Sequence, residues 1–368
     1  MTAPIAPLIE VSGPAPARGE QYGRAADTRI RAGLGIYEKL LLKRGLDWPR
    51  VLEVAQKLGN KLKRTYPLHI AEIEGIARGA QVHPGEILLL NSRSEVLNLI
   101  ELGRSAIDEL DDGCTSALAL PEKTKTGRLL HGQNWDWRPE CAETTVVLAV
   151  RRETGPDILT YVEAGGLARA GLNSAGIAVT GNNLSCDDDG KHGVGTPISV
   201  IRRLILEAPT FADALKAVCA SPRTISNNMT ISCATDGGQA INLETTPKDV
   251  FWSHPEAGVI THANHFTSAI GRAKVTDLGY RSHADTLFRD HRLRKRLTEV
   301  GDPLELDHFK SAFRDDFSAP NGVLRTPQHM NGDRISATVA TLLMDAEVKH
   351  LAVCQSPYHS THYETYTL

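Results

Sequence analysis

Apolar residues in the first hundred positions recur three or four residues apart, which is the period of an α-helix. This spacing predicts helices over residues 19–44, 49–66, 68–81 and 84–104. Gly45 ends the first of them, and Asp47 is a candidate N-cap for the second. A short strand or arm is expected around residues 8–11. The leading third of the chain is therefore predicted to form a helical layer.

After residue 114 the pattern changes to β-branched runs separated by glycine and asparagine turns, which is typical of strands. Strands are predicted over residues 115–120, 128–135, 144–151, 158–163, 176–180, 229–234, 239–245, 249–252 and 258–261. Helices are predicted over residues 196–208, 210–220, 282–299 and 303–316, and a closing hairpin over 337–345 and 350–355. Strand runs interleaved with paired helices indicate an α+β fold, with two sheets stacked between helical layers in one compact unit.

The composition narrows the class of protein without changing this picture. The 368 residues are 41% hydrophobic and 23% charged, as in ordinary soluble globular proteins. A net charge of −3 argues against a surface for nucleic acid or anionic membranes. No run approaches the roughly 18 consecutive apolar residues of a membrane span, and the first residues show no secretory signal. Six cysteines without CxxC spacing favour a reducing, cytoplasmic setting.

Candidate chemistry stands at the boundary between the two patterns, in the run Asp111-Asp112-Gly113-Cys114-Thr115-Ser116. A thiol at Cys114 can attack the carbonyl of the preceding peptide, and Gly113 offers an unhindered carbonyl. Cleavage of that bond would leave Cys114 with a thiol and a free α-amine. The unperturbed pKa of such an amine is roughly 7.7–8.0, which suits a general base at neutral pH. The alternative is that Cys114 is a buried, unreactive core thiol.

Such a cut would divide the chain into a helical leader, residues 1–113, and a catalytic portion, residues 114–368. By share of length the two fragments would weigh roughly 12 and 28 kDa. We expect them to stay together as one compact domain, because the apolar faces of the leader helices need a partner.

Several further motifs follow this boundary in a fixed order. They are Gly132-Gln133-Asn134-Trp135-Asp136, Glu163-Ala164-Gly165, Asn173-Ser174-Ala175-Gly176-Ile177-Ala178-Val179, Leu243-Glu244, Thr261-His262-Ala263-Asn264-His265 and Ala337-Thr338. With Asp112-Gly113-Cys114-Thr115 and the helical leader, they make nearly the whole chain resemble the acyl-coenzyme A:isopenicillin N acyltransferases, which are self-processing N-terminal-nucleophile enzymes. The resemblance implies a four-layer αββα fold of two antiparallel sheets between helical layers, autocatalytic cleavage, and amide chemistry through an acyl thioester.

The resemblance also implies roles for individual residues. Cys114 matches the nucleophile, Asp136 an acid near its amine, and Asn264 the asparagine whose side-chain amide meets the developing oxyanion. Such a donor contributes about 2.7–4 kcal/mol to the transition state. Arg334 is the nearest candidate for an arginine that the family places just before an Ala-Thr pair, although it stands one position further away.

Four residues are candidates for substrate binding: Thr115, Trp135, Asn182 and His262. Asn182 is the nearest amide to Thr180, which stands where related bile-salt-hydrolase-like members have an asparagine. His262 and His265 invite a metal-site interpretation, but zinc sites usually need three or four ligands, so no metal is expected. The basic run from Arg289 to Arg296 is interpreted as a solvated helix face, with contact to a coenzyme A phosphate as the alternative.

These observations predict a self-processing amidohydrolase that cleaves a small N-acyl or amide substrate through a thioester on Cys114. The first alternative is an acyltransferase that moves the acyl group, from an amide or an acyl-coenzyme A, to an amine. Two other classes remain open: an unprocessed binding protein on the same scaffold, and a metal-dependent hydrolase that uses the histidines. No cofactor is expected, and the expected partners are the small-molecule substrate and the two fragments themselves.

Overall fold

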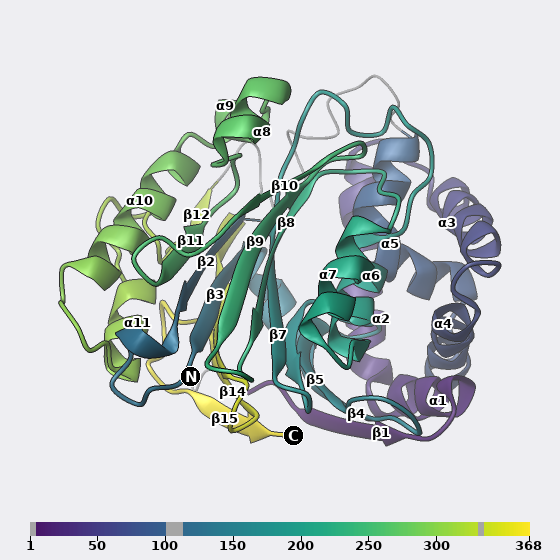
Figure 1. Cartoon of the computed structure of the whole chain (residues 1–368). Coiled ribbons are helices and arrows are strands. Elements are labelled where there is room, and N and C mark those ends of the chain that lie inside the picture. Colours follow the sequence, from purple (N-terminus) through teal and green to yellow (C-terminus); the bar gives the residue numbers. More distant parts are fainter. Residues whose placement is uncertain (1–4, 101–112, 330–334) are drawn as a thin grey trace.

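Two β-sheets pack face to face between layers of helices in the computed structural model, which describes residues 5–100, 113–329 and 335–368 (Figure 1). Helices α6 (Ile198–Glu207) and α7 (Phe211–Cys219) and those of the leader lie on the outer side of one sheet. Helices α10 (Asp285–Thr298) and α11 (Leu306–Phe313) lie on the outer side of the other. The four-layer αββα fold is therefore confirmed. Among the described helices, none is both long and apolar enough to cross a membrane.

In the described part of the chain, the first sheet has eight strands in the order β1-β4-β5-β6-β7-β8-β9-β10. They are β1 (Leu8–Ser12), β4 (Thr145–Arg151), β5 (Ile158–Glu163), β6 (Ala170–Asn173), β7 (Ile177–Asn183), β8 (Asn227–Cys233), β9 (Gln239–Thr245) and β10 (Val250–Ser253). Strand β1 runs parallel to β4, and the other neighbours are antiparallel. The expectation of two purely antiparallel sheets is wrong at this edge.

The second sheet follows the order β11-β2-β3-β13-β14-β15, and β12 pairs with β13 beside this path. Its strands are β2 (Gly113–Ala119), β3 (Leu130–Trp137), β11 (Val259–His262), β12 (Gln328–His329), β13 (Ile335–Asp345), β14 (His350–Gln355) and β15 (Glu364–Thr367). All of its paired strands are antiparallel. Strand β2, which begins at the predicted cleavage bond, lies between β11 and β3 near one edge of the sheet.

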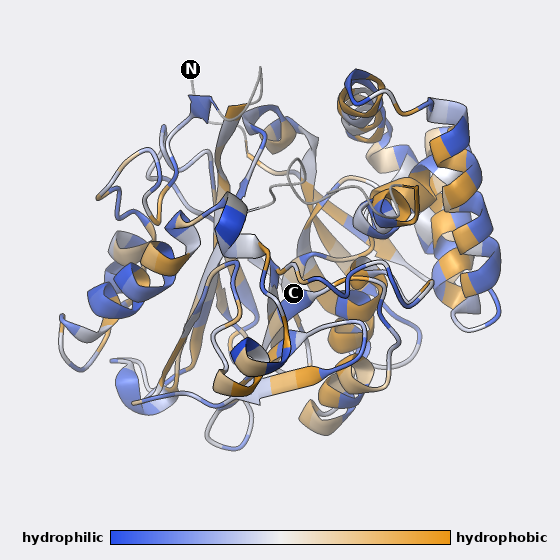
Figure 2. Ribbon diagram, turned by 90° about the horizontal axis from the view of Figure 1, so that it is seen from above, coloured by the Kyte–Doolittle hydropathy of each residue, from blue (hydrophilic) through white to orange (hydrophobic). Residues whose placement is uncertain are grey.

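The described helices agree with the predicted ones over most of the chain. They are α1 (Ala15–Ala25), α2 (Asp27–Lys43), α3 (Trp48–Leu62), α4 (Pro67–Ala80), α5 (Pro84–Ile100), α6 (Ile198–Glu207), α7 (Phe211–Cys219), α8 (Ala269–Lys274), α9 (Gly279–Ser282), α10 (Asp285–Thr298) and α11 (Leu306–Phe313). The single helix predicted over residues 19–44 is two helices that meet at Ala26. Banding of hydrophobic and hydrophilic residues along the helices in Figure 2 is what amphipathic helices show when one face packs on a sheet.

Helices α1 and α4 cross at very short range. A Cβ built on Gly19 would lie 2.2 Å from the Glu72 carbonyl oxygen, and one on Gly79 would lie 2.2 Å from the Glu20 carbonyl oxygen. Only glycine permits this approach, so the two helices behave as one rigid block of the leader.

The leader is joined to the rest of the molecule by strand pairing and by buried hydrogen bonds. Its strand β1 forms one edge of the first sheet. The side chain of Asn91 in α5 donates to the Gly165 carbonyl oxygen at 2.8 Å and accepts from the Leu167 nitrogen at 2.8 Å. The Gly165 nitrogen in turn donates to the Tyr22 hydroxyl at 3.0 Å. The leader therefore fixes the turn between β5 and β6, which faces the candidate site.

Candidate active site

The predicted nucleophile is the second residue of β2. Cys114 is paired with Trp135 of β3, and Gly113 is paired with Asp136. The Cys114 side chain is almost fully buried. The register therefore brings together the two motifs that the sequence separates by about twenty residues.

Gly113 is in close contact with the side chain of Asp136. A Cβ built on Gly113 would lie 3.0 Å from both Cβ and Oδ2 of Asp136, and 3.4 Å from Nη1 of Arg325. Contacts of this length are tighter than ordinary Cβ packing. The close approach of Asp136 therefore favours glycine at residue 113, in addition to the unhindered carbonyl expected from the sequence.

Asp136 is buried and faces two arginines and a hydroxyl. Thr338 Oγ1 donates to Asp136 Oδ1 at 2.7 Å, Arg325 Nε lies 3.4 Å from Oδ2, and Arg289 Nη1 lies 4.0 Å from Oδ2. Burial raises the pKa of Asp136 above its usual range, while the two arginines and Thr338 oppose that rise. The carboxyl therefore belongs to a buried charge network rather than to a solvated turn.

Asn264 follows β11 and contacts Cys114 directly. Its Oδ1 accepts from the Cys114 backbone nitrogen at 2.9 Å and from Arg289 Nη2 at 2.9 Å. Its Nδ2 donates to the Asn183 carbonyl oxygen at 2.9 Å. Two donors on one side and an acceptor on the other determine which way the amide points. The amide oxygen, not the nitrogen, thus faces the atom that would become the α-amine.

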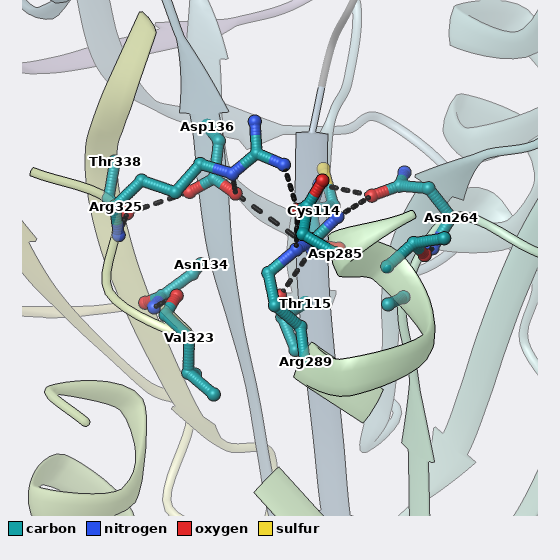
Figure 3. A network of polar contacts seen from close by, with 12 residues as sticks. Cys114, Thr115, Asn134, Asp136, Asn264, Asp285, Arg289, Val323, Arg325 and Thr338 are labelled. Carbon is teal, nitrogen blue, oxygen red and sulfur yellow. Dashed lines mark hydrogen bonds and ion pairs between the residues drawn. The ribbon is translucent and has the colours of Figure 1, made fainter. Parts of the chain in front are cut away.

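Arg289 in α10 is fully buried, and the prediction of a solvated basic face is wrong at this residue. Its Nη1 donates at 2.7 Å to both the Cys114 carbonyl oxygen and Thr115 Oγ1, and its Nε donates to Asp285 Oδ2 at 2.7 Å (Figure 3). Sequence reasoning missed this residue as part of the site. The signal that could have found it is its spacing of four from Leu293 and eight from Leu297, which share its buried face.

Arg325 and Asp285 complete an alternating row of charges, which runs Asp136, Arg325, Asp285, Arg289. Arg325 pairs with Asp285 through Nη2. Burial alone would raise the pKa of Asp285, but Arg289 and Arg325 outweigh it and hold that pKa far below its usual range. The Arg325 segment is anchored by Asn134 of β3, which donates to the Val323 carbonyl oxygen at 2.9 Å (Figure 3). The predicted Arg334 lies outside the described residues.

On the other side of Cys114 lies Arg169, in the turn before β6. Its Nη2 is 3.9 Å from Cys114 Sγ, and its guanidinium lies 4.1 Å from the centre of the Trp135 ring. Beyond it is a small cavity of about 90 Å³ whose charged and amide lining includes Arg93, Glu95, Glu163, Asn183 and Arg202. Burial raises the pKa of Glu95 to about 7. The cavity therefore lies between the leader helix α5 and Arg169, whose guanidinium is beside Cys114.

Two of the predicted substrate-binding residues, Asn182 and His262, lie between the two sheets, next to Ser116 of β2. Asn182 Nδ2 donates to the His262 carbonyl oxygen at 3.0 Å, and its Oδ1 accepts from Ser116 Oγ at 3.1 Å. The His262 ring contacts Glu244 Oε1 through Nε2 at 2.9 Å and the Ala263 carbonyl oxygen through Nδ1 at 2.8 Å. Both residues therefore join the two sheets beneath the site.

The His262 ring faces two acceptors, which favours its protonated form. Burial alone would lower the pKa of His262, but the hydrogen bond to Glu244 and its charge raise it. Burial likewise would raise the pKa of Glu244, yet its bond with His262 and the donors at Thr267 and Ser268 lower it to about 2. Within the described residues, no group of three or more His, Cys, Asp or Glu side chains is arranged to hold a metal ion.

Comparisons with known proteins show the family to which the chain belongs. Residues 122–356, more than half of the chain, match the model of the family described as acyl-coenzyme A:6-aminopenicillanic acid acyl-transferase. The chain belongs to this family. The predicted family and the prediction of an enzyme are thereby confirmed. Asp136, Asn264, Arg289 and Arg325 lie inside the matched stretch of this acyl-transferase family member, whereas Cys114 and the leader precede it.

A curated relative of this family member is the 40 kDa form of acyl-coenzyme A:6-aminopenicillanic-acid-acyltransferase from Emericella nidulans. It is 28% identical over 249 residues, which cover 67% of this chain and 66% of the relative. The chain therefore spans about two thirds of the length of that relative. Among solved structures, a mutant conjugated bile acid hydrolase from Clostridium perfringens matches with a TM-score of 0.51 and 16% identity, over 69% of this chain and 92% of that one. This second likeness concerns the fold alone.

Proposed function

We propose that this acyl-transferase family member cleaves itself between Gly113 and Cys114 and then acts on a small N-acyl or amide substrate through Cys114. The observation that carries the proposal is the bond from the Cys114 nitrogen to Asn264 Oδ1, 2.9 Å long and beside the buried Asp136. This bond holds in place the one nitrogen that cleavage would convert into a free amine. A thiol and an amine on one residue supply nucleophile and base together.

The proposed self-cleavage is an acyl shift followed by hydrolysis. Sγ of Cys114 attacks the Gly113 carbonyl carbon, the C–S bond forms, and the C–N bond breaks as the nitrogen takes up the thiol proton. Water then hydrolyses the thioester, which releases the Gly113 carboxylate and restores the thiol.

In the proposed substrate reaction the same sulfur attacks the substrate carbonyl. The α-amine of Cys114 takes the thiol proton and passes it to the leaving amine, so an acyl thioester remains on the enzyme. Water resolves the thioester in a hydrolase, and a second amine resolves it in a transferase. We favour hydrolysis, because water is always present and its exclusion needs a special site. Transfer is the second candidate, supported by the names of the family and of the Emericella relative.

The proposal includes a leader that stays bound after the cut. It is supported by strand β1 in the first sheet and by the buried ion pair between Glu72 of the leader and Arg203 of the catalytic portion, at 2.9 Å. A cytoplasmic, reducing setting also remains part of the proposal, supported by six cysteines that form no disulfide within the described residues.

Intact mass and N-terminal sequencing of the purified protein test the proposal. We expect fragments of roughly 12 and 28 kDa, the larger one beginning Cys-Thr-Ser, and a single uncut, inactive chain for Cys114→Ala. Incubation with N-acyl amines and an acceptor amine separates the two reactions, since free acid indicates hydrolysis and a new amide indicates transfer. A Cys114→Ala chain that is still cut at this bond would implicate an external protease. A wild-type chain that stays whole and inactive would favour the binding-protein alternative.

A further inference from the structure

The buried guanidinium of Arg289 is linked to both peptide groups of Cys114, directly on the carbonyl side and through Asn264 on the nitrogen side. Arg289 Nη1 donates directly to the Cys114 carbonyl oxygen at 2.7 Å. Its Nη2 donates to Asn264 Oδ1 at 2.9 Å, and the same oxygen accepts from the Cys114 nitrogen. The two peptide groups that flank the Cys114 side chain are therefore fixed by Arg289, one directly and one through Asn264 (Figure 3).

The contacts use the forked shape of the arginine. Nη1 also reaches Thr115 Oγ1 at 2.7 Å, and Nε is held by Asp285 Oδ2 at 2.7 Å. A lysine carries the same charge on a single nitrogen and cannot span these acceptors, which come from β2, from the segment after β11 and from α10. A lysine at position 289 therefore keeps the charge of Arg289 and loses its geometry, so the two contributions can be measured separately.

We propose that Arg289 is the positioning residue for Cys114: it fixes the backbone of the nucleophile and the orientation of the Asn264 amide, and its charge keeps the α-amine neutral after cleavage. This inference rests on the proposed function. Arg289 reaches the reacting atoms through Asn264 and the main chain, so it acts through its neighbours rather than on the substrate.

The sign of the charge effect follows from the groups around the Cys114 nitrogen. Among the described residues, the charged groups of this network are Arg289 and Asp285 from α10, Asp136 from β3, Arg325 from the segment before β12, and Arg169 from the turn before β6, beside Sγ. Arg289 and Arg325 form ion pairs with Asp136 and Asp285. Removing the charge of Arg289 takes one positive charge away from the neighbourhood of the nitrogen, which favours the protonated amine and raises its pKa. The acid limb of the pH profile of kcat/KM should then move to higher pH.

The test compares Arg289→Gln and Arg289→Lys with a matched control, Arg292→Gln. Arg292 lies in the same helix, where it pairs with Asp315 at 2.8 Å, away from Cys114. For Arg289→Gln we expect self-cleavage and kcat to fall at least about tenfold with KM little changed, and the acid limb to move up by about half a pH unit. Arg289→Lys should lower kcat but leave the acid limb in place, and Arg292→Gln should change neither.

A second measurement does not depend on turnover. The rate at which iodoacetamide alkylates Cys114, followed by peptide mass spectrometry at pH 7, should fall about threefold or more in Arg289→Gln, because removing a nearby positive charge disfavours the thiolate. Arg289→Lys, with its charge kept, should stay close to wild type and also serves if Arg289→Gln does not fold. An unchanged alkylation rate and an unmoved acid limb, or a raised KM with kcat intact, would overturn the proposal. A wild-type enzyme that neither cuts itself nor turns over amides fails the proposed function instead, and the alkylation rates still decide the role of Arg289.

Discussion

The side chain of Asp136 lies so close to Gly113 that a methyl group at residue 113 would crowd it. Oδ2 and Cβ of Asp136 are both 3.0 Å from the place where a Cβ of residue 113 would stand. The two residues are opposite each other in the register of β2 and β3. The residue before the predicted scissile bond and the acid beside it therefore form one closely packed unit, which a substitution at either place will disturb.

Gly113→Ala should slow self-cleavage at least about tenfold, because the added methyl pushes Asp136 or β2 away from its position and a small displacement of reacting groups is costly. Intact mass measured over time after synthesis gives the rate. Gly35→Ala is the control, since a Cβ there meets nothing within 4 Å. Equal cleavage rates for Gly113→Ala and wild type would show that the packing against Asp136 is irrelevant to processing.

Asp136→Asn keeps the shape of the side chain and removes its charge. Because Arg325 and Arg289 then lack one of the two carboxylates that balance them, we expect self-cleavage and amide turnover to fall together by about a hundredfold. Thr338→Val removes only the 2.7 Å hydrogen bond to Asp136. It should therefore slow both reactions less, by raising their activation free energy by about 1 kcal/mol. Full activity of the Asp136→Asn enzyme would exclude a role for the charge.

Retention of the leader after cleavage should depend on Glu72. This carboxylate pairs with Arg18 at 2.6 Å and with Arg203 at 2.9 Å, and it is buried, so Glu72→Gln should cost about 3–5 kcal/mol of unfolding free energy and let the small fragment dissociate more readily. Urea titration and gel filtration of the processed protein measure the two effects. Glu74→Gln in the same helix removes a surface pair with Lys63 and should cost only about 0–1 kcal/mol. Equal losses of unfolding free energy from Glu72→Gln and Glu74→Gln would contradict the prediction that the Glu72 ion pairs hold the leader.

The Glu244–His262 pair predicts a pH dependence of stability. Glu244 has a lowered pKa, so its contribution is present above its usual value of 4.5 and is lost as the pH falls toward 2. His262 has a raised pKa, so its contribution is complete below its usual value of 6.5 and is lost as the pH rises through the raised one. Tm of the wild type should fall more steeply above pH 6.5 than Tm of His262→Gln. His359→Gln, at an exposed position, is the control, and parallel curves for wild type and His262→Gln would refute the prediction.

Many helices and strands could be predicted because the spacing of hydrophobic residues within each element depends on neighbouring residues in the sequence. Strands such as Ile158–Glu163 and Gln239–Thr245 carry β-branched residues between turn residues, and both were predicted with the bounds that the structure has. Strand β6 was missed because Ala170–Asn173 is four residues long and contains a glycine, which gives no alternation to detect. The break between α1 and α2 was missed because the helical spacing continues through Ala26.

The candidate site could be predicted only where a motif surrounds the residue. Cys114, Asp136 and Asn264 stand in recognisable runs, and the structure brings all three together. Arg325 lies in an irregular segment with no period, and it meets Asp136 only because β13 pairs with β3. Arg289 was hidden within a basic run, since charge alone does not tell a buried face of a helix from a solvated one. Contacts between distant segments depend on sheet register, which single-sequence patterns do not determine.

The bond from Thr338 to Asp136 connects the proposed cut to strand β13, whose Thr338 is made 202 residues after Asp136. A nascent chain has Gly113 and Cys114 outside the ribosome long before residue 338 is synthesised, yet the acid beside them has not received its hydroxyl partner. Under the proposed self-cleavage, a chain truncated before β13 would lack the whole strand that pairs with β3 beside Asp136, and it would keep its scissile bond intact. Maturation would thus report that the ribosome has passed β13.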